Sequence, residues 1–307
     1  MKLFVAPLQG HTDAAFRHYH AEIYNGGADA YFSPFMRVER GAVRPRDIAD
    51  VTSALNDNHR LVSQFIFRDA KEFEALMSVV VERGLKSVDL NLGCPFPPQV
   101  HHGRGSAMLQ KPDVLREIHA IMNHYPNVVF SAKMRLGVDA PSQWRDVIDV
   151  INQMPLEFVT VHPRIASQQY GGSLYIDEFE QLYGVSAHPV VFNGDVRTPQ
   201  DFDSVIQRFP ELHGVMVGRG LLARPSLIEE YRSGCDWDSE QRINCLLELH
   251  EQIFEYYQGK LCGDTQVLMK IKSFWEYLEP EIGHKAAKAI KKATSLNKYE
   301  VAVALIS

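Results

Sequence analysis

The sequence predicts a (β/α)8 (TIM) barrel followed by a small C-terminal domain made only of helices. Three observations support this fold class. Eight short β-rich runs alternate with helical patterns, two of these runs are almost continuously apolar, and only helical periodicity follows residue 232. Eight strands with intervening helices are typical of a closed parallel barrel. An open doubly wound sheet is the alternative, but no G-x-G-x-x-G sequence opens a predicted helix to support it.

The predicted strands and helices follow from the spacing of apolar residues. The strands cover residues 2–6, 30–33, 61–67, 87–91, 128–134, 157–161, 189–192 and 214–217. Helical spacing marks residues 69–83, 113–125 and 143–154, where apolar side chains recur every three or four positions. The runs 128–130 and 189–192 are nearly all apolar, which is typical of parallel strands buried on both faces. Pro189 is compatible with a strand because it comes first in its run.

A linker-like break at residues 233–238 separates the two expected domains. We therefore expect a catalytic barrel over residues 1–235 and a helical domain over residues 236–307. Its predicted helices cover residues 239–258, 264–279 and 283–293. The last of them is basic on one face through the lysines of 285–292. That face is either solvated surface or a contact for RNA phosphates.

The composition limits the function classes. The chain has 307 residues, of which 45% are hydrophobic and 23% charged, as in one large globular domain with an appendage. Its 4 cysteines form no C-x-x-C pair, so we expect no metal site and no disulfide framework, and a reducing cytoplasm fits best. No apolar run approaches the roughly 20 residues of a membrane span. The N-terminus predicts a first strand instead of a signal peptide.

The net charge of −6 argues mildly against nucleic acid as a bulk electrostatic partner. A local basic face can still bind RNA, so this partner class stays open. The oligomeric state is also open, with a monomer as the expectation.

Cys94 is the most informative residue of the chain. It follows the predicted strand 87–91, with Gly93 before it and Pro95 after it. Gly permits a tight turn and Pro ends the strand, so the thiol is expected at the carboxyl end of the barrel. There it could transfer a proton or act as a nucleophile. The alternative is a small buried apolar cysteine.

Other strand ends carry polar residues where a barrel places its active site. Pro7 lies in the first loop, where Thr12 or Asp13 is expected to cap the next helix. Gln64 lies in an apolar strand, so its amide needs partners, which are either a heteroaromatic ring or the backbone. Lys133 ends another apolar strand and needs an anion, which is either a ligand or a carboxylate such as Asp89.

The last three strand ends indicate an anion site. His162 and Arg164 follow the sixth strand, where a lone histidine is otherwise a satisfied core residue. The seventh and eighth strands end in two glycine-rich turns. These turns contain Asn193, Gly194, Asp195, Gly218 and Arg219. Turns at these positions frequently bind phosphate in such barrels. The alternative is a pair of plain glycine turns with a solvated arginine. Together with Gln64, Lys133 and Cys94, these turns suit flavin mononucleotide (FMN).

Through its short motifs, the sequence resembles the tRNA-dihydrouridine synthase family. The matching stretches occur in the family's order and run from the first strand to the last. They are residues 6–10 with Thr12 and Asp13, 89–95, 105–108, 133–137, 162–164, 193–195 and 218–220. The cysteine motif is the most specific of these stretches.

The resemblance implies an FMN-bound barrel, a C-terminal tRNA-binding domain and NADPH as reductant. It implies reduction of the C5–C6 double bond of a tRNA uridine, with Cys94 as the general acid that protonates C5 of a flipped-out base. The residues implied to hold FMN are Pro7, Gln64, Lys133, His162, Asn193, Gly194, Asp195, Gly218 and Arg219. Asn91 and Arg135 are implied to line the uridine side.

The sequence also departs from the family pattern. Members usually carry a lysine shortly after Cys-Pro, where this chain has residues 96–99, Phe-Pro-Pro-Gln. Pro163 replaces the usual glycine between His162 and Arg164, and Ala166 stands where a second basic residue is common. His101, His102 and Arg104 are either compensating RNA contacts or solvated loop residues. Two alternative functions stay open. The first is a flavin-dependent reductase of a free pyrimidine or small activated alkene, and the second is a non-catalytic RNA-binding relative.

Overall fold

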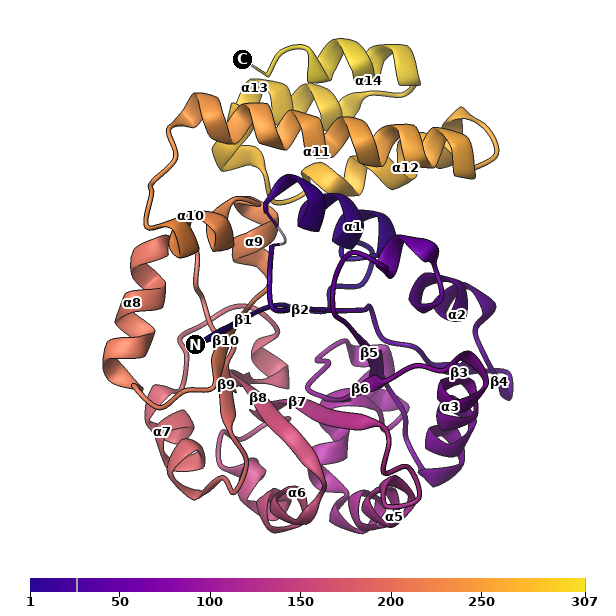
Figure 1. Ribbon diagram of the computed structural model, residues 1–307, viewed down its shortest axis with the longest axis vertical. Helices are drawn as coiled ribbons and strands as arrows, with labels where there is room; N and C mark the ends of the chain where they lie inside the picture. Colours follow the sequence, from indigo (N-terminus) through magenta and orange to yellow (C-terminus); the bar gives the residue numbers. More distant parts are fainter. Residues whose placement is uncertain (26, 307) are drawn as a thin grey trace.

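The computed structural model describes residues 1–25 and 27–306. Its main feature is a closed barrel of eight parallel strands in the order β1-β10-β9-β8-β7-β6-β5-β2 (Figure 1). The strands are β1 (Lys2–Val5), β2 (Ala30–Phe32), β5 (Leu61–Phe65), β6 (Ser87–Leu92), β7 (Val129–Gly137), β8 (Leu156–Ile165), β9 (Val190–Phe192) and β10 (Gly214–Val217). The predicted (β/α)8 barrel is confirmed.

Helices surround the barrel and connect its strands. They are α1 (Ala14–Ile23), α2 (Pro45–Val51), α3 (Ala70–Arg83), α4 (Pro97–His101), α5 (Pro112–Met122), α6 (Ile148–Gln153), α7 (Ile176–Val185), α8 (Pro199–Arg208), α9 (Arg219–Ala223) and α10 (Leu227–Ser233). Asp13 caps α1 by accepting a hydrogen bond from the N–H of Phe16 at 3.3 Å, as one of the two predicted caps. A short antiparallel hairpin, β3 (Val38–Glu39) with β4 (Ala42–Val43), was not predicted.

Four helices follow the barrel: α11 (Ser239–Lys260), α12 (Asp264–Lys272), α13 (Glu279–Lys292) and α14 (Leu296–Val303). They lie over the edge formed by α1 and α9 (Figure 1). The predicted helix 264–279 is too long, because a 3-10 turn at Ser273–Trp275 follows α12. In α13, Gly283 has a φ of 78° and interrupts the helix near its start. Within the described residues, no helix has both the length and the apolar character needed to cross a membrane.

In the barrel, the largest differences from the predicted bounds are in two strands and one helix. β7 continues to Gly137 and β8 to Ile165, so the polar residues at their ends lie on strands and not in loops. The predicted helix 143–154 is a 3-10 turn at Gln143–Asp146 and then α6. Val147, between them, has a φ of −123°, which is not helical.

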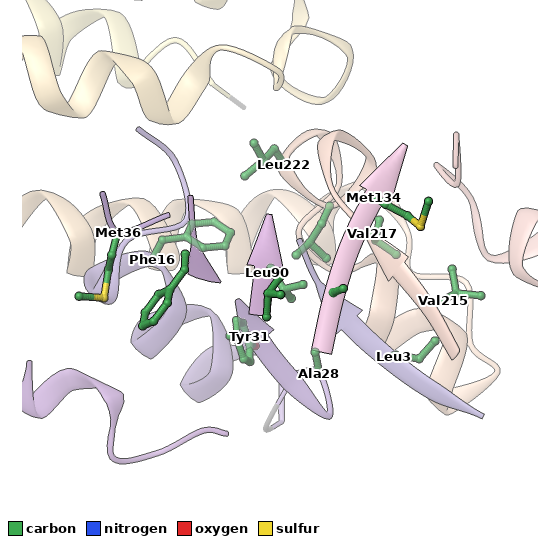
Figure 2. Packing of buried hydrophobic residues seen from close by; sticks show 14 of the residues in the cluster. Leu3, Phe16, Ala28, Tyr31, Met36, Leu90, Met134, Val215, Val217 and Leu222 are labelled. Carbon is green, nitrogen blue, oxygen red and sulfur yellow. The ribbon is translucent and has the colours of Figure 1, made fainter. Parts of the chain in front are cut away.

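Packing closes the barrel interior at its amino end. Phe4 and Phe158 stack at 5.1 Å between ring centroids, inside a cluster that also contains Phe32 and Met216. On the outside of the strands, Leu3, Leu90 and Val215 belong to one large cluster with Phe16 of α1 (Figure 2). Because apolar side chains fill the interior below, a ligand site is expected only at the carboxyl ends of the strands.

Candidate active site

A cavity of about 770 Å³ lies at the carboxyl ends of the strands. It is large enough for a cofactor together with part of a substrate. All the site residues predicted from the sequence line it: Pro7, Gln64, Asn91, Cys94, Lys133, Arg135, His162, Asn193, Gly194, Asp195, Gly218 and Arg219. The structure thus brings together residues that are spread over more than 200 positions of the chain.

The turn at Cys94 is held by Asn91. The side-chain oxygen of Asn91 accepts hydrogen bonds from the N–H groups of Gly93 at 3.1 Å and Cys94 at 2.8 Å. Burial raises the pKa of the Cys94 thiol. The backbone N–H of Phe96 and the nearby cations act in the opposite direction, but their effect is smaller. A thiol with a raised pKa stays protonated near neutral pH. This environment suits a proton donor better than a thiolate nucleophile.

A chain of side-chain hydrogen bonds runs from the barrel interior to this turn. Asp89 accepts hydrogen bonds from Gln64 Nε2 at 2.8 Å and from the Ser131 hydroxyl at 2.7 Å. Gln64 Oε1 in turn accepts a hydrogen bond from Asn91 Nδ2 at 2.8 Å. The partners of the Gln64 amide are therefore side chains, and not the backbone. The chain fixes the orientation of both amides that face the cavity.

Lys133 is not paired with Asp89. Among the described residues, no carboxylate lies within ion-pair distance of its ammonium and no group accepts a hydrogen bond from it. Burial lowers the pKa of Lys133 to about 8, with the positive charge of Arg135 adding to the effect. Burial also raises the pKa of Asp89 to about 6. A cation without a protein partner at the cavity wall fits an electron-rich or anionic ligand.

Two further basic side chains stand beside Lys133. Arg135 donates hydrogen bonds to the carbonyl oxygens of Gly93 and Ile165, each at 3.0 Å. Burial lowers the pKa of Arg135 to about 10, so its guanidinium remains charged at neutral pH. Burial together with the three neighbouring cations lowers the pKa of His162 well below its ordinary value. His162 is therefore neutral and can donate or accept a hydrogen bond.

The turns after β9 and β10 form the other end of the cavity. Among the described residues, no group accepts a hydrogen bond from the N–H of Gly194, Asp195, Gly218 or Arg219. Arg219 is not merely solvated, because it contacts Asp195 at 3.3 Å. Asp195 also accepts two hydrogen bonds from Arg164, at 3.0 and 2.6 Å. Unpaired N–H groups beside a fixed guanidinium fit a phosphate group.

Gly220 permits the close packing behind this phosphate cradle. A Cβ at Gly220 would lie 1.9 Å from the carbonyl oxygen of Val196, so a side chain there would push the two turns apart. Asn193 joins them by donating a hydrogen bond to the carbonyl oxygen of Met216 at 2.7 Å. With the unpaired Lys133 at the far side, the residues present fit a ligand that has a phosphate at one end and an electron-rich ring at the other, as FMN has.

Sequence reasoning missed several residues that line the cavity. The guanidinium groups of Arg135 and Arg219 both pack over the Tyr170 ring, 5.4 and 4.5 Å from its centroid. Tyr277 reaches the cavity from the C-terminal helices. Conversely, Arg104 is not free for RNA, because it pairs with Glu72 at 2.6 Å. A tyrosine in a loop has no local pattern, so only the fold could reveal Tyr170 and Tyr277.

No metal centre accompanies this cavity in the part of the chain that the structure describes, where no group of three or more His, Cys, Asp or Glu side chains could hold an ion. The fold and the cavity lining together define a (β/α)8 barrel whose carboxyl-end cavity would fit a phosphate-bearing ligand next to a cysteine.

Comparison with known proteins gives the family. Residues 4–298 match the family described as "Dihydrouridine synthase (Dus)". The chain therefore belongs to the dihydrouridine synthase family and is an enzyme, and the resemblance seen in its sequence is confirmed.

Curated relatives agree with this assignment, and a solved structure shares the fold. The chain is 25% identical to the "Probable tRNA-dihydrouridine synthase" of Helicobacter pylori over 91% of this chain and 84% of that protein. It is 26% identical to the protein of the same name in Aquifex aeolicus, over 88% of this chain and 87% of that protein. The old yellow enzyme of Trypanosoma cruzi shares the fold, with a TM-score of 0.51, 8% identity and coverage of 77% and 89% of the two chains.

Proposed function

We propose that this protein reduces the C5–C6 double bond of a uridine in tRNA, with FMN as cofactor and NADPH as reductant. The observation that carries the proposal is that Cys94, the unpaired Lys133 and the glycine turns after β9 and β10 line one cavity. The names of the curated relatives support tRNA as the substrate class.

The cradle end of the cavity would hold the phosphate of FMN through Arg219 and the N–H groups of Gly194 and Gly218. Pro7, Gln64, Lys133, His162, Asn193 and Asp195 would surround the rest of the cofactor. The chemistry that FMN would supply when held by these residues is hydride donation, here to C6 of the uracil ring. Lys133 places a positive charge beside the ring system, where negative charge develops during the reaction.

Cys94 completes the reduction. Its Sγ–H bond breaks and a C–H bond forms at C5 of the base, so the double bond gains one hydride and one proton. Asn91 holds the Cys94 turn in place, and Arg135 offers a charged donor on the same wall. Arg135 is fixed by two carbonyl oxygens and can therefore orient a carbonyl group of the base without reorganising.

The RNA must deliver a base into the cavity, since the reacting atoms of a stacked uracil are out of reach. Phe96 is 56% exposed and Tyr170 is 45% exposed, and both line the cavity. Aromatic faces at such an opening can stack on an extruded base. Lys285, Lys288, Lys291 and Lys292 are exposed on α13. We propose that this helix belongs to an RNA-binding domain over residues 236–307, beside the catalytic barrel of residues 1–235.

The test uses purified protein with its bound chromophore, NADPH and an unmodified tRNA transcript, with free uridine as the competing substrate. We expect flavin absorbance in the protein and dihydrouridine in the transcript only. Cys94→Ala should retain the flavin and lose dihydrouridine formation by about 100-fold or more. Equal turnover of free uridine would favour a small-molecule reductase. A colourless protein that still binds RNA would favour a non-catalytic relative.

A further inference from the structure

The cavity has a second cationic edge that the proposed chemistry does not use. Arg37, Arg44 and Arg46 line it, and they come from the β3–β4 hairpin and the first turn of α2. The phosphate cradle, by contrast, is built from the turns after β9 and β10. The hairpin lies between β2 and β5 in the sequence. Its arginines and the turns after β9 and β10 therefore belong to different parts of the barrel rim.

The hairpin is held by one hydrogen bond between its ends and one to a neighbouring segment. The N–H of Arg44 donates to the carbonyl oxygen of Arg37 at 3.2 Å, which keeps the two arginines together. Arg104 donates to the carbonyl oxygen of Val38 at 2.9 Å and so connects the hairpin to the segment that follows Cys94. A hairpin whose backbone is fixed in this way keeps its arginines close together at the cavity edge.

Charge on this segment is predominantly positive. Arg37 and Arg44 share one carboxylate, Glu39, at 3.5 and 3.2 Å. Asp47 accepts a hydrogen bond from the N–H of Arg37 at 3.3 Å. Arg46 forms no ion pair with any described carboxylate and is exposed. The guanidinium groups therefore outnumber the local carboxylates and can take up a further anion.

Gln99 brings a buried, unpaired acceptor beside the same cavity. It lies on α4, lines the cavity and is 7% exposed. Its Oε1 atom is buried and receives no hydrogen bond from any described residue. A buried acceptor without a donor is costly unless a ligand supplies the donor.

We propose that Arg37, Arg44, Arg46 and Gln99 form a subsite for a nucleotide phosphate ester, separate from the FMN cradle. The guanidinium groups bind the phosphate, and the Gln99 side chain turns so that its Oε1 atom accepts a hydrogen bond from a ribose hydroxyl or base N–H of the same nucleotide. The subsite rests on the proposed function, which places two nucleotide ligands at this opening. The phosphate comes either from the RNA backbone beside the reduced uridine or from the dinucleotide reductant.

The test compares the unsubstituted holoenzyme with Arg44→Gln/Arg46→Gln. Arg40→Gln is the matched control, because Arg40 belongs to the same hairpin but does not line the cavity. One arm titrates an unmodified tRNA transcript at several salt concentrations. The other arm measures the rate of flavin bleaching against NADPH concentration without RNA.

If the phosphate belongs to RNA, the double variant should bind the transcript about tenfold more weakly, and its salt slope should fall by about one for each phosphate that it no longer binds. Flavin bleaching should then be unchanged. A higher half-saturating NADPH concentration with unchanged RNA binding would assign the phosphate to the reductant. If neither arm differs from the Arg40→Gln control, the subsite does not exist.

Gln99→Leu provides a second readout. Removing an unpaired buried acceptor should leave the melting temperature unchanged or raise it, while the affinity for the ligand identified above falls several-fold. A variant with unchanged affinity, or with affinity and stability lowered together, would remove Gln99 from the subsite. If the unsubstituted protein forms no dihydrouridine while the arginine variant still loses RNA affinity, the proposed function fails and the subsite remains.

Discussion

Gly105 lies directly against Cys94. A Cβ at Gly105 would stand 2.7 Å from Cys94 Cβ and 2.8 Å from the Cys94 carbonyl oxygen. Gly105 also has a φ of +60°, a conformation that favours glycine. Ser106 reinforces the contact by donating its hydroxyl hydrogen to the Cys94 carbonyl oxygen at 3.1 Å. The segment 105–106 therefore forms the wall that sets the position of the thiol.

Gly105→Ala should lower dihydrouridine formation although every proposed site residue remains present. The added methyl group must displace the Cys94 backbone, and a shift of about 1 Å in a reacting group can cost about 100-fold in rate. Turnover with a tRNA transcript measures the effect. Gly84→Ala is the control for positive φ alone, since its Cβ would meet nothing within 4 Å. An equal loss of turnover in Gly105→Ala and Gly84→Ala would indicate a general folding defect instead.

Arg219→Gln should weaken FMN binding and leave riboflavin binding nearly unchanged. The guanidinium faces the phosphate cradle, and a charge-assisted hydrogen bond contributes about 1.5–3 kcal/mol, which is about 10- to 100-fold in affinity. Fluorescence titration of the flavin-free protein with each flavin separates the two effects. Arg208→Gln, on the outer helix α8, should change neither affinity. A matching loss of riboflavin affinity would show that Arg219 does not act on the phosphate.

Asp89→Asn should change how stability depends on pH. Burial raises the pKa of Asp89 from 3.8 to about 6, so the folded protein keeps this proton over a pH range in which the unfolded chain loses it. The stability of the flavin-free protein should therefore fall as pH rises from about 4 to about 6, by up to about 3 kcal/mol from this group. Denaturant unfolding at several pH values should show this slope in the unsubstituted protein and a smaller slope in the variant.

The matched control for that measurement is Asp113→Asn, because Asp113 is exposed at the start of α5. Asp113→Asn should show the same slope of unfolding free energy against pH as the unsubstituted protein. Identical slopes for Asp89→Asn and the unsubstituted protein would contradict a raised pKa at Asp89.

Lys270→Met should destabilise the contact between the C-terminal helices and the barrel. Lys270 pairs with Asp13 at 2.8 Å and donates to the carbonyl oxygen of Gly10 at 3.0 Å, while the Tyr257 hydroxyl also donates to Asp13. Removal of the ammonium leaves a largely buried carboxylate without its counter-charge. We expect a loss of about 1–3 kcal/mol at neutral pH, measured by denaturant unfolding.

The pH dependence of this loss follows from Asp13. Lys270 and Tyr257 hold the pKa of the Asp13 carboxyl below its ordinary value of 3.8 against the opposing effect of burial. Lys270 and Tyr257 therefore stabilise the folded protein above pH 3.8, and this stabilisation is lost as the pH falls through the lowered pKa of Asp13. The difference between Lys270→Met and the unsubstituted protein should therefore shrink in acid. Lys285→Met, on the exposed face of α13, should show no loss at either pH.

Local sequence patterns were sufficient for the barrel and for most of the proposed site. Each of the eight strands contains a short β-rich run, and polar residues follow Val161, Phe192 and Val217 within or directly after three of the strands. A closed parallel barrel brings all carboxyl strand ends to one face, so a residue at a strand end is near the others whatever their separation in sequence. The Cys94 turn was predictable for the same reason, since Gly93 and Pro95 mark it locally.

Residues outside the strand ends could not be predicted in this way. The β3–β4 hairpin has two residues in each strand, too few to produce a periodic pattern. The sequence therefore does not predict that this hairpin places Arg37, Arg44 and Arg46 at the rim of the cavity. The bonds of Asp89 to Gln64 and Ser131, in place of Lys133, depend on which side chains face each other across neighbouring strands.

The amino-acid sequence by itself determined the barrel, the ring of polar residues at its mouth and the family to which the chain belongs, because these depend on local hydrophobic spacing and on short motifs. Only the tertiary structure decided which of those polar groups are paired and which are free. Lys133 and Gln99 Oε1 have no partner among the described residues, whereas Asp195 and Arg104 do. Pairing depends on distances of a few ångströms between segments far apart in the chain, and no local pattern encodes those distances.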